Sequence, residues 1–89
     1  MKVYITICSE AESGIKKVKA FDTFDKANAF AKEWFRFEET TTEYIREEDA
    51  EEGETCYEVD EAIGEYLLYE KGDYNNTYAS AIVFEKEIE

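Results

Sequence analysis

This 89-residue sequence contains no histidine. The remaining candidates for catalysis or metal binding are its carboxylates and its two cysteines. Cys8 and Cys56 lie far apart and form no C-x-x-C pair. Zinc sites and Cys–His nucleophiles need histidines or clustered cysteines. We therefore expect both thiols to serve as small apolar side chains that stay reduced in the cytosol. The sequence predicts neither a metal site nor a cofactor.

Carboxylate pairs are plentiful, and two of them could act as acid and base or hold Mg²⁺. The sequence offers no glycine-rich phosphate loop and no nucleophile motif, and the acidic run from Glu47 to Glu54 lacks the ligand spacing of an EF-hand loop. An enzyme is thus the least favoured class. We predict a protein that works by binding another macromolecule without catalysing a reaction.

The charge of the chain is strongly asymmetric. The net charge is −13, of which residues 1–36 contribute +2 and residues 37–89 contribute −15. Residues 38–61 hold twelve acids and a single base, Arg46. If this segment were fully helical, its charges would be spaced by about 3 Å, close to the roughly 3.4 Å between phosphates of one DNA strand. The pattern favours a surface that binds a basic partner and mimics nucleic acid, whereas a solvated face that only maintains solubility is the competing explanation.

We predict that six acids and two tyrosines of this segment contact the partner. They are Glu43, Glu47, Glu48, Asp49, Glu51, Glu52, Tyr44 and Tyr57. Aromatic rings would add anchoring area, and Tyr74 is a further candidate for this role. A basic partner surface would relieve the repulsion between acids four residues apart and would speed encounter. The same net charge repels phosphate, so we expect no direct contact with nucleic acid.

The elements that must position these residues follow an α+β pattern. Residues 2–8 and 15–21 are rich in strand formers and predict a hairpin, with the first strand central and the second an edge protected by lysines. Residues 23–37 predict a helix with Asp22 or Thr23 as N-cap and Asp25 in its first turn. Its core-facing stripe consists of Phe24, Ala27, Phe30, Ala31, Trp34 and Phe35.

The second half of the chain is harder to assign. Residues 40–42 are three threonines, which should interrupt a helix, and residues 43–52 fit either a short acidic helix ending at Gly53 or a mobile loop. Residues 55–64 fit a helix or a strand. Residues 65–71 and 78–88 predict a second hairpin around the turn-rich residues 71–77. The predicted fold is an antiparallel sheet of about four strands, in two hairpins, with one aromatic-rich helix on one face, forming a single domain over residues 1–89.

Hydropathy bears on where the protein works. No stretch approaches the roughly 20 apolar residues of a membrane span, and the N-terminus lacks the apolar run and cleavage site of a signal peptide. We therefore expect a cytoplasmic protein with no membrane partner. A homodimer joined through a sheet edge is compatible with the sequence.

The order Met1-Lys2-Val3-Tyr4-Ile5, then Phe21-Asp22-Thr23-Phe24-Asp25-Lys26-Ala27, resembles that of many small proteins encoded by bacterial phages and prophages. This likeness covers under half of the chain and carries no functional residues. The whole profile, which is short, acidic and poor in motifs, is similar to that of anti-CRISPR and anti-restriction inhibitors, several of which mimic DNA.

The resemblance implies an inhibitor that binds a nucleic-acid-binding defence complex in the cytoplasm of a bacterial host. The alternative is an interaction module, such as an adaptor or an antitoxin-like partner, that does not mimic nucleic acid. Such a module would bind through the aromatic sheet face or through an exposed edge strand.

Overall fold

The structure, a computed structural model, describes residues 1–88, and of residues 74–76 it describes the backbone alone. The elements in chain order are β1 (Lys2–Glu10), β2 (Gly14–Phe21), α1 (Phe24–Phe35), α2 (Phe37–Glu43), β3 (Ile45–Arg46), the 3₁₀ helix η1 (Glu47–Asp49), β4 (Thr55–Asp60), β5 (Glu65–Glu70) and β6 (Asp73–Glu87).

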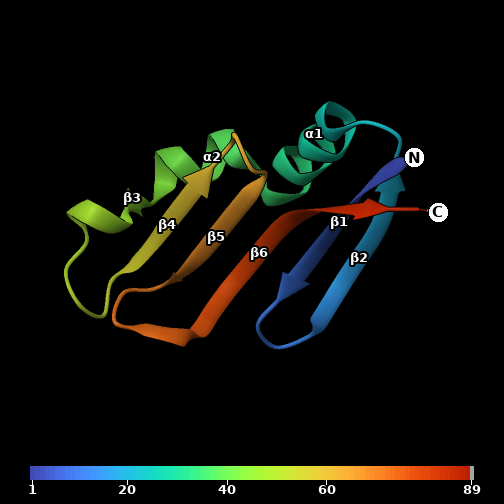
Figure 1. The fold of residues 1–89 in the computed structure, drawn as a ribbon. Coiled ribbons are helices and arrows are strands. Elements are labelled where there is room, and N and C mark those ends of the chain that lie inside the picture. The colour runs from blue at the N-terminus through green and yellow to red at the C-terminus, as the bar shows by residue number, and fades with distance from the viewer. Residues whose placement is uncertain (89) are drawn as a thin grey trace.

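These elements form one twisted sheet in the order β2-β1-β6-β5-β4-β3 (Figure 1). Neighbouring strands are antiparallel except β3 and β4, which pair in parallel. The prediction of an antiparallel sheet of about four strands was therefore wrong, because the sheet has six strands and is mixed. The prediction left residues 55–64 open between helix and strand and so did not count β4, and it did not include β3, whose two residues are too few to show a period.

The two predicted hairpins are present. β1 pairs with β2 on one side and with β6 on the other, so β1 is central and β2 is an edge strand as expected. β5 pairs with β6, but the turn between them is shorter than predicted and β6 already begins at Asp73. The residues 55–64 that the sequence left open form β4 and a turn to β5.

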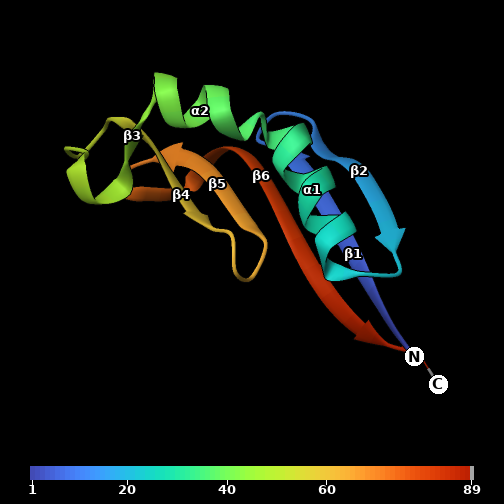
Figure 2. The same cartoon turned by 90° about the horizontal axis from the view of Figure 1, so that it is seen from above.

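Helix α1 begins where it was predicted, after the Thr23 cap, and buries its predicted face, but it ends at Phe35, two residues before the predicted end at residue 37. The Thr23 side chain accepts a hydrogen bond from the Lys26 N–H, and the helix ends where Arg36 adopts a left-handed conformation with φ 57°. Ala27, Ala31 and Phe35 of the apolar stripe are buried. Both helices lie on the same side of the sheet (Figure 2).

Helix α2 was not predicted, because three consecutive threonines disfavour a helix interior. The structure shows how they are tolerated. The Thr40 hydroxyl donates to the Phe35 carbonyl at 3.0 Å, and the Thr42 hydroxyl donates to the Glu38 carbonyl at 2.8 Å. These bonds satisfy carbonyls near the end of α1 and within α2, where threonine can return a hydrogen bond to the preceding turn.

Residues 43–52 do not form the acidic helix that one prediction gave them. They continue from the end of α2 into β3, the 3₁₀ helix η1 and an extended connection to β4. A continuous helix would stack Glu43 on Glu47 and Glu47 on Glu51, and like charges at this spacing destabilise a helix. The observed path also brings Ala50 to the sheet, where it is buried.

The sheet carries a buried cluster on each face. The larger cluster lies under α1 and comprises Cys8, Ala31, Phe35, Tyr66 and Ala81. The smaller cluster comprises Ala50, Cys56 and Tyr69, with Leu67 packed against it. Because Tyr66 and Leu67 are neighbours on β5, their side chains point to opposite faces of the sheet. The smaller cluster therefore lies on the face that the helices do not cover.

Candidate functional site

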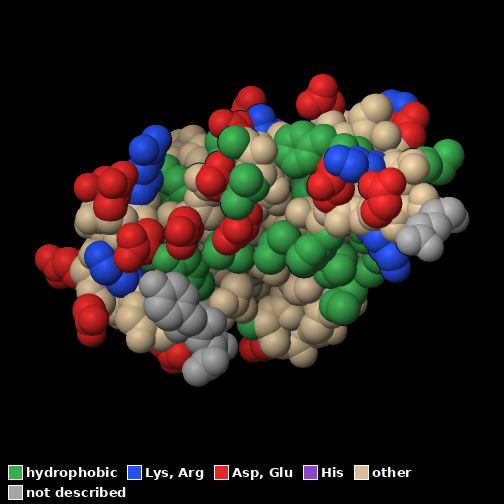
Figure 3. All heavy atoms as spheres, viewed as in Figure 1, with side chains coloured by type: hydrophobic (Ala, Val, Ile, Leu, Met, Phe, Trp, Pro, Cys, Tyr) green, Lys and Arg blue, Asp and Glu red, His purple; other side chains and the backbone are tan. Residues whose placement is uncertain are grey.

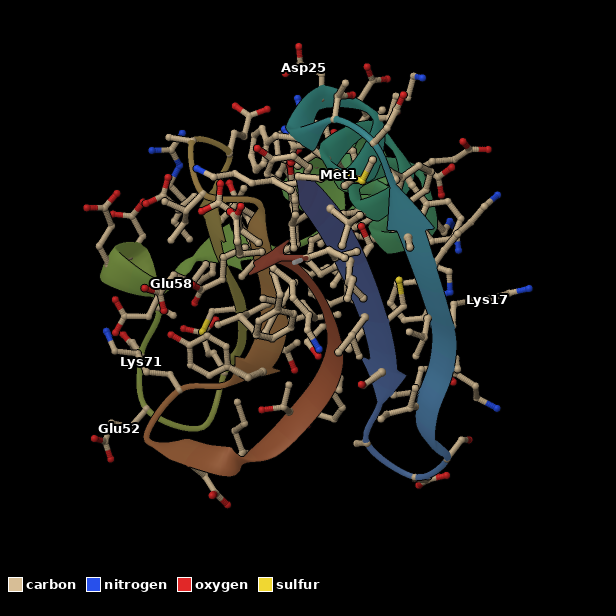
Figure 4. The ribbon with its side chains drawn as sticks, turned by 45° about the vertical axis from the view of Figure 1, so that its right-hand side comes forward. Met1, Lys17, Asp25, Glu52, Glu58 and Lys71 are labelled. Carbon is tan, nitrogen blue, oxygen red and sulfur yellow. The ribbon has the colours of Figure 1, made fainter. Side chains whose placement is uncertain are left out.

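The acidic segment forms one end of an elongated molecule. We call residues 37–61, which form α2, β3, η1 and β4, the acidic end. The molecule measures 45 × 23 × 17 Å, and this end lies opposite β1 and β2 (Figure 1). Acidic side chains gather over β3, β4 and β5 in Figure 3. In Figure 4, Glu52, Glu58 and Lys71 lie on one side of the molecule and Lys17 of β2 lies on the other.

Most of the predicted contact residues are accessible at this end. Five of the six predicted acids are exposed, and the sixth, Glu47, is half-buried. Tyr44 and Tyr57 are also half-buried. The side chain of Tyr74 lies outside the described residues. The structure thus leaves the predicted acids in contact with solvent and embeds the predicted tyrosines in the surface.

Few cations balance the acids of residues 38–61. Four ion pairs reach them: Arg36–Glu39, Arg46–Glu48, Lys71–Glu47 and Lys32–Glu61. The remaining eight acids of this run form no ion pair with a residue that the structure describes. Three of these eight accept hydrogen bonds, Glu54 from the Glu51 N–H, Asp60 from the Ala62 N–H and Glu58 from the Tyr69 hydroxyl. None of the eight is paired with a described cationic side chain, so a basic partner surface could supply the missing positive charge.

An open hollow of about 690 Å³ lies between α2 and β4. Its lining residues are Phe37, Thr41, Arg46, Glu47, Glu48, Tyr57, Glu58, Val59, Asp60, Glu61 and Ala62. Three predicted residues, Glu47, Glu48 and Tyr57, meet here. Carboxylates beside aromatic rings can receive a cationic side chain, because the acids attract its charge and the rings pack against its stem.

Arg46 occupies part of this hollow. Its guanidinium lies 3.7 Å from the Glu48 carboxylate. A hydrogen bond with Tyr57, together with the negative charge of Glu48, raises the pKa of Arg46 above its ordinary value. A partner that brings its own cation to the hollow would compete with Arg46 for these groups.

The other predicted contacts do not converge on the hollow. Glu43, Asp49, Glu51, Glu52 and Tyr44 lie elsewhere on the acidic end. Sequence reasoning missed several residues that line the hollow, chiefly Phe37, Thr41, Glu58, Asp60 and Glu61. The acids among them were visible as part of the charged run, but only the pairing of β4 brings them beside α2.

Lys71 holds the connection between β3 and β4 in place. Its ammonium group donates to the Glu47 carbonyl at 2.9 Å and to the Ala50 carbonyl at 2.7 Å. Its backbone N–H donates to the Glu54 carbonyl at 2.9 Å, and its carbonyl accepts from the Gly53 N–H at 3.0 Å. One residue therefore anchors both halves of a segment that buries only Ala50, and no local sequence pattern indicated this role.

The smaller cluster beneath this segment contains ionisable groups held in their neutral forms. Burial raises the pKa of the Tyr69 hydroxyl, and the nearby Glu58 charge acts in the same direction. That hydroxyl donates to the Glu58 carboxylate at 3.2 Å. Burial also raises the pKa of the Cys56 thiol. Both groups thus behave as packing elements at neutral pH.

Cys8 and Cys56 are free and buried, and each belongs to a different cluster. Within residues 1–88, no three acidic, cysteine or histidine side chains are grouped so that they could hold a metal ion. No described helix combines the length and apolar character that a bilayer crossing requires. Comparisons with protein-family models, with curated proteins and with solved structures give no match.

Proposed function

We propose that this protein binds a basic, nucleic-acid-binding surface of another protein through its acidic end, and that it inhibits that protein by displacing nucleic acid. The supporting observation is the spatial separation of charge. Eight acids of residues 38–61 have no ion-pair partner in the described structure, and they share one end of a 45 Å long molecule. On this proposal the protein acts by binding and not by catalysis.

The geometry limits the form that mimicry takes. The acids do not follow a helical rod with a regular phosphate-like spacing, because residues 43–61 run through a short strand, a 3₁₀ turn and β4. They cover a rounded end that also contains the hollow between α2 and β4. Such a surface suits a concave groove lined with lysine and arginine, where acids and aromatic rings meet several cations at once.

The direct test is a competition experiment. Purified protein is titrated into a panel of DNA-binding defence complexes, including CRISPR effectors and restriction enzymes, each bound to labelled DNA. We expect displacement of DNA from one member, weakened when salt rises from about 50 to 300 mM, because long-range attraction between exposed charges is screened. Displacement from no member of the panel would contradict the assignment to defence complexes.

A matched pair of variants identifies the surface responsible. The first replaces Glu43, Glu47, Glu48, Asp49, Glu51 and Glu52 by the corresponding amides. The control replaces six acids outside the acidic end in the same way, namely Glu10, Glu12, Asp25, Glu33, Glu85 and Glu87. Both variants have the same net charge, so a difference between them reports position. We expect the first to lose displacement and the control to retain it; equal losses would reduce the effect to net charge alone.

A second candidate function is an interaction module that binds through apolar surface. The observation in its favour is the sheet face opposite the helices, where Val18 and Phe84 are 60% and 47% exposed. Binding of this kind would resist salt, because hydrophobic association is not weakened by screening. Displacement or capture that is unchanged by the six amide substitutions would favour this second candidate.

A further inference from the structure

Strand β2 forms an edge of the sheet that no other described segment covers. In the sheet order its one neighbour is β1, and no described segment makes a backbone hydrogen bond to its other side. Residues 14–20 of the strand are all exposed, and β2 lies at the margin of the molecule in Figure 1. Such an edge presents a row of unpaired N–H and C=O groups, to which a further strand can be added.

The pairing with β1 fixes the face to which each side chain of β2 points. Lys17 lies opposite Cys8, which is buried under α1. Lys19 lies opposite Thr6, whose hydroxyl donates to a carbonyl of α1 at 2.9 Å. Directly opposite residues share a face of the sheet, so both lysines point to the helix side. Val18, between them, points to the other side.

A bulge limits the regular part of β2. Two consecutive residues of β1 pair with Lys17 and Ile15, so Lys16 is an extra residue between them. Ile15 consequently shares a face with Val18, although residues three apart in a regular strand point to opposite sides. Because a bulge bends and twists the strand that contains it, an added strand fits best along residues 17–21, which pair regularly with β1.

The three lysines of β2 lack carboxylate partners among the described residues. The ion pairs of the structure use the N-terminal amine and six of the ten lysine and arginine side chains, and none of the six is on β2. The Lys19 ammonium instead lies 5.6 Å and 5.4 Å from the ring centroids of Phe21 and Phe30. In a chain with 23 acids, one strand thus presents three cations that no described carboxylate neutralises.

Lysines on an edge strand discriminate between the strands that could pair with it. Antiparallel pairing of β2 with β2 of a second copy would bring lysines of both chains together, and like charges directly opposite each other destabilise a sheet. A strand with carboxylates at the matching positions gains from the same charges. The β2 edge therefore rejects its own copy and favours an acidic strand.

We propose that the β2 edge binds an extended acidic segment of a partner protein as an additional strand. Residues two apart in a strand are separated by about 6.6 Å and point to the same side. Two acids at this spacing lie opposite Lys17 and Lys19, and an apolar residue between them lies opposite Val18. Backbone hydrogen bonds along residues 17–21 supply affinity, and the alternation of acidic and apolar side chains supplies specificity.

The net charge of the protein does not oppose a short acidic segment at this edge. β2 and the acidic end lie at opposite ends of a molecule 45 Å long (Figure 1). Residues 1–36 have a net charge of +2, and exposed charges are screened beyond about 8 Å at physiological salt. The unpaired backbone of β2 favours a peptide over a nucleic acid, because a nucleic acid has no N–H and C=O ladder to pair with it.

Fluorescence anisotropy with short labelled peptides tests the proposal on the full chain. The probe contains the alternating sequence EVEVE between neutral residues, and the control peptide contains EEEVV, which has the same composition and charge. We expect the alternating peptide to bind about fivefold more tightly or better, because it alone places acids and apolar residues on opposite sides. Equal affinities would overturn the added strand. Tighter binding of a hexathymidylate oligonucleotide than of EVEVE would assign the lysines to nucleic acid and overturn the proposal.

A matched pair of double variants locates the site. Lys17→Gln with Lys19→Gln removes both lysines that face the added strand. Arg36→Gln with Lys86→Gln makes the same change in net charge at exposed residues away from β2. We expect the first pair to weaken binding of EVEVE about tenfold or more and the second to bind like the parent. Equal weakening by both pairs would overturn the β2 edge as the site, and far-UV circular dichroism checks that each variant is folded.

Amide hydrogen exchange of the unmodified protein reports the backbone pairing without any variant. Amides of residues 17–21 that do not donate to β1 should exchange rapidly in the protein alone. Saturating EVEVE should slow their exchange about tenfold or more and leave amides of β3 and η1 unchanged. Chemical-shift changes without slower exchange would show contact with lysine side chains alone and would contradict the added strand.

Sedimentation equilibrium without peptide checks for a second copy at the same edge. We expect a monomer between about 5 and 500 μM protein. Self-association that EVEVE disperses would assign the β2 edge to another copy of this chain and overturn the acidic partner. The six amide substitutions at the acidic end should leave binding of EVEVE intact, so this proposal and the proposed binding of a basic surface can fail independently.

Discussion

The two buried clusters of the sheet are built from similar residues but are covered in different ways. Each contains one free cysteine and one buried tyrosine: Cys8 and Tyr66 in the larger cluster, and Cys56 and Tyr69 in the smaller one. The larger cluster is covered by the twelve residues of α1. The smaller cluster is covered by the segment between β3 and β4, of which Ala50 alone is buried.

This difference shows how a highly acidic segment can be held on a protein. Charged residues cannot supply a hydrophobic stripe, so the segment is fixed by hydrogen bonds from Lys71 to the Glu47 and Ala50 carbonyls. These bonds use the backbone of the segment and leave its carboxylates facing solvent. The larger cluster contains more buried residues, and the smaller one lies beneath the acidic segment.

The largest expected effect concerns the turn between β4 and β5, where Gly64 packs against Val83 and Phe24 on the side of the larger cluster. Gly64 has φ +70°, and an added Cβ would lie 2.7 Å from Val83 Cγ2 and 3.2 Å from Phe24 Cε2. Gly14 has nearly the same φ, +71°, with nothing within 4 Å of an added Cβ. Gly64→Ala should cost about 2–5 kcal/mol in free energy of unfolding, and Gly14→Ala about 1 kcal/mol. Urea unfolding measures both, and equal losses would contradict the close packing at Gly64.

The next prediction compares how fast the cysteine thiols of the two clusters are labelled by a reagent in solution. In single-cysteine backgrounds, made with Cys8→Ser or Cys56→Ser, we expect Cys56 to be labelled faster than Cys8, because fewer contacts hold its cover. Lys71→Met should speed labelling of Cys56 about tenfold or more, since hydrogen bonds from a charged group contribute about 1.5–3 kcal/mol. Labelling of Cys8 should not change.

Lys86→Met is the control for this experiment, because Lys86 is exposed on β6 opposite Val3, away from both thiols and from the segment. If Lys71→Met speeds the labelling of both thiols equally, then Lys71 stabilises the whole fold and not the acidic segment in particular. A kinetic trace of reagent consumption at constant pH gives the two rates.

Alkaline pH should weaken the larger cluster. Burial raises the pKa of the Cys8 thiol from 9.0 to about 11 and that of the Tyr66 hydroxyl from 10.0 to about 12. The fold therefore favours the protonated forms, and the associated stability is complete below about pH 9 and is lost as pH rises toward 12. Melting temperatures across this range should fall. The fall should be shallower in Tyr66→Phe, and an unchanged slope would mean that Tyr66 is not responsible.

The smallest effect is electrostatic and belongs to the acidic end. Glu51→Gln and Glu52→Gln together should raise stability by a few tenths of a kcal/mol at low salt, because each removes a repulsive charge. The gain should vanish at about 1 M salt, where screening is nearly complete. Glu12→Gln is the control, because Glu12 lies in the β1–β2 turn, within residues 1–36, whose net charge is only +2. It should show little gain. A gain that persists at high salt would point to a cause other than charge.

The first half of the fold could be predicted because its signals are local. Alternation in β1, the Thr23 cap and the spacing of Ala27, Ala31 and Phe35 each depend on residues within a few positions of one another, and the structure confirms all of them. The helix α2 and the strand β3 were missed, and β4 was left open between helix and strand. They are stabilised by contacts distant in sequence, such as the pairing of Cys56 with Ile45 and with Tyr69.

The candidate site was predicted in composition but not in arrangement. The charge of residues 38–61 could be counted directly, and the predicted acids are accessible. Which acids lie together could not be predicted, because the hollow is formed by α2 on one side and by β4 on the other. Glu47, Glu48 and Tyr57 meet there, whereas Glu51 and Glu52 do not.

Residue type and short-range spacing were sufficient to predict the charge asymmetry, the aromatic helix and the edge position of the lysine-rich strand. Contacts between segments distant in the chain were needed to show that Lys71 anchors the acidic segment, and that a bulge turns Ile15 to the same face as Val18. Both outcomes depend on register and on chain reversal. A one-residue change in strand pairing moves side chains to the other face of a sheet, and local sequence does not encode that choice.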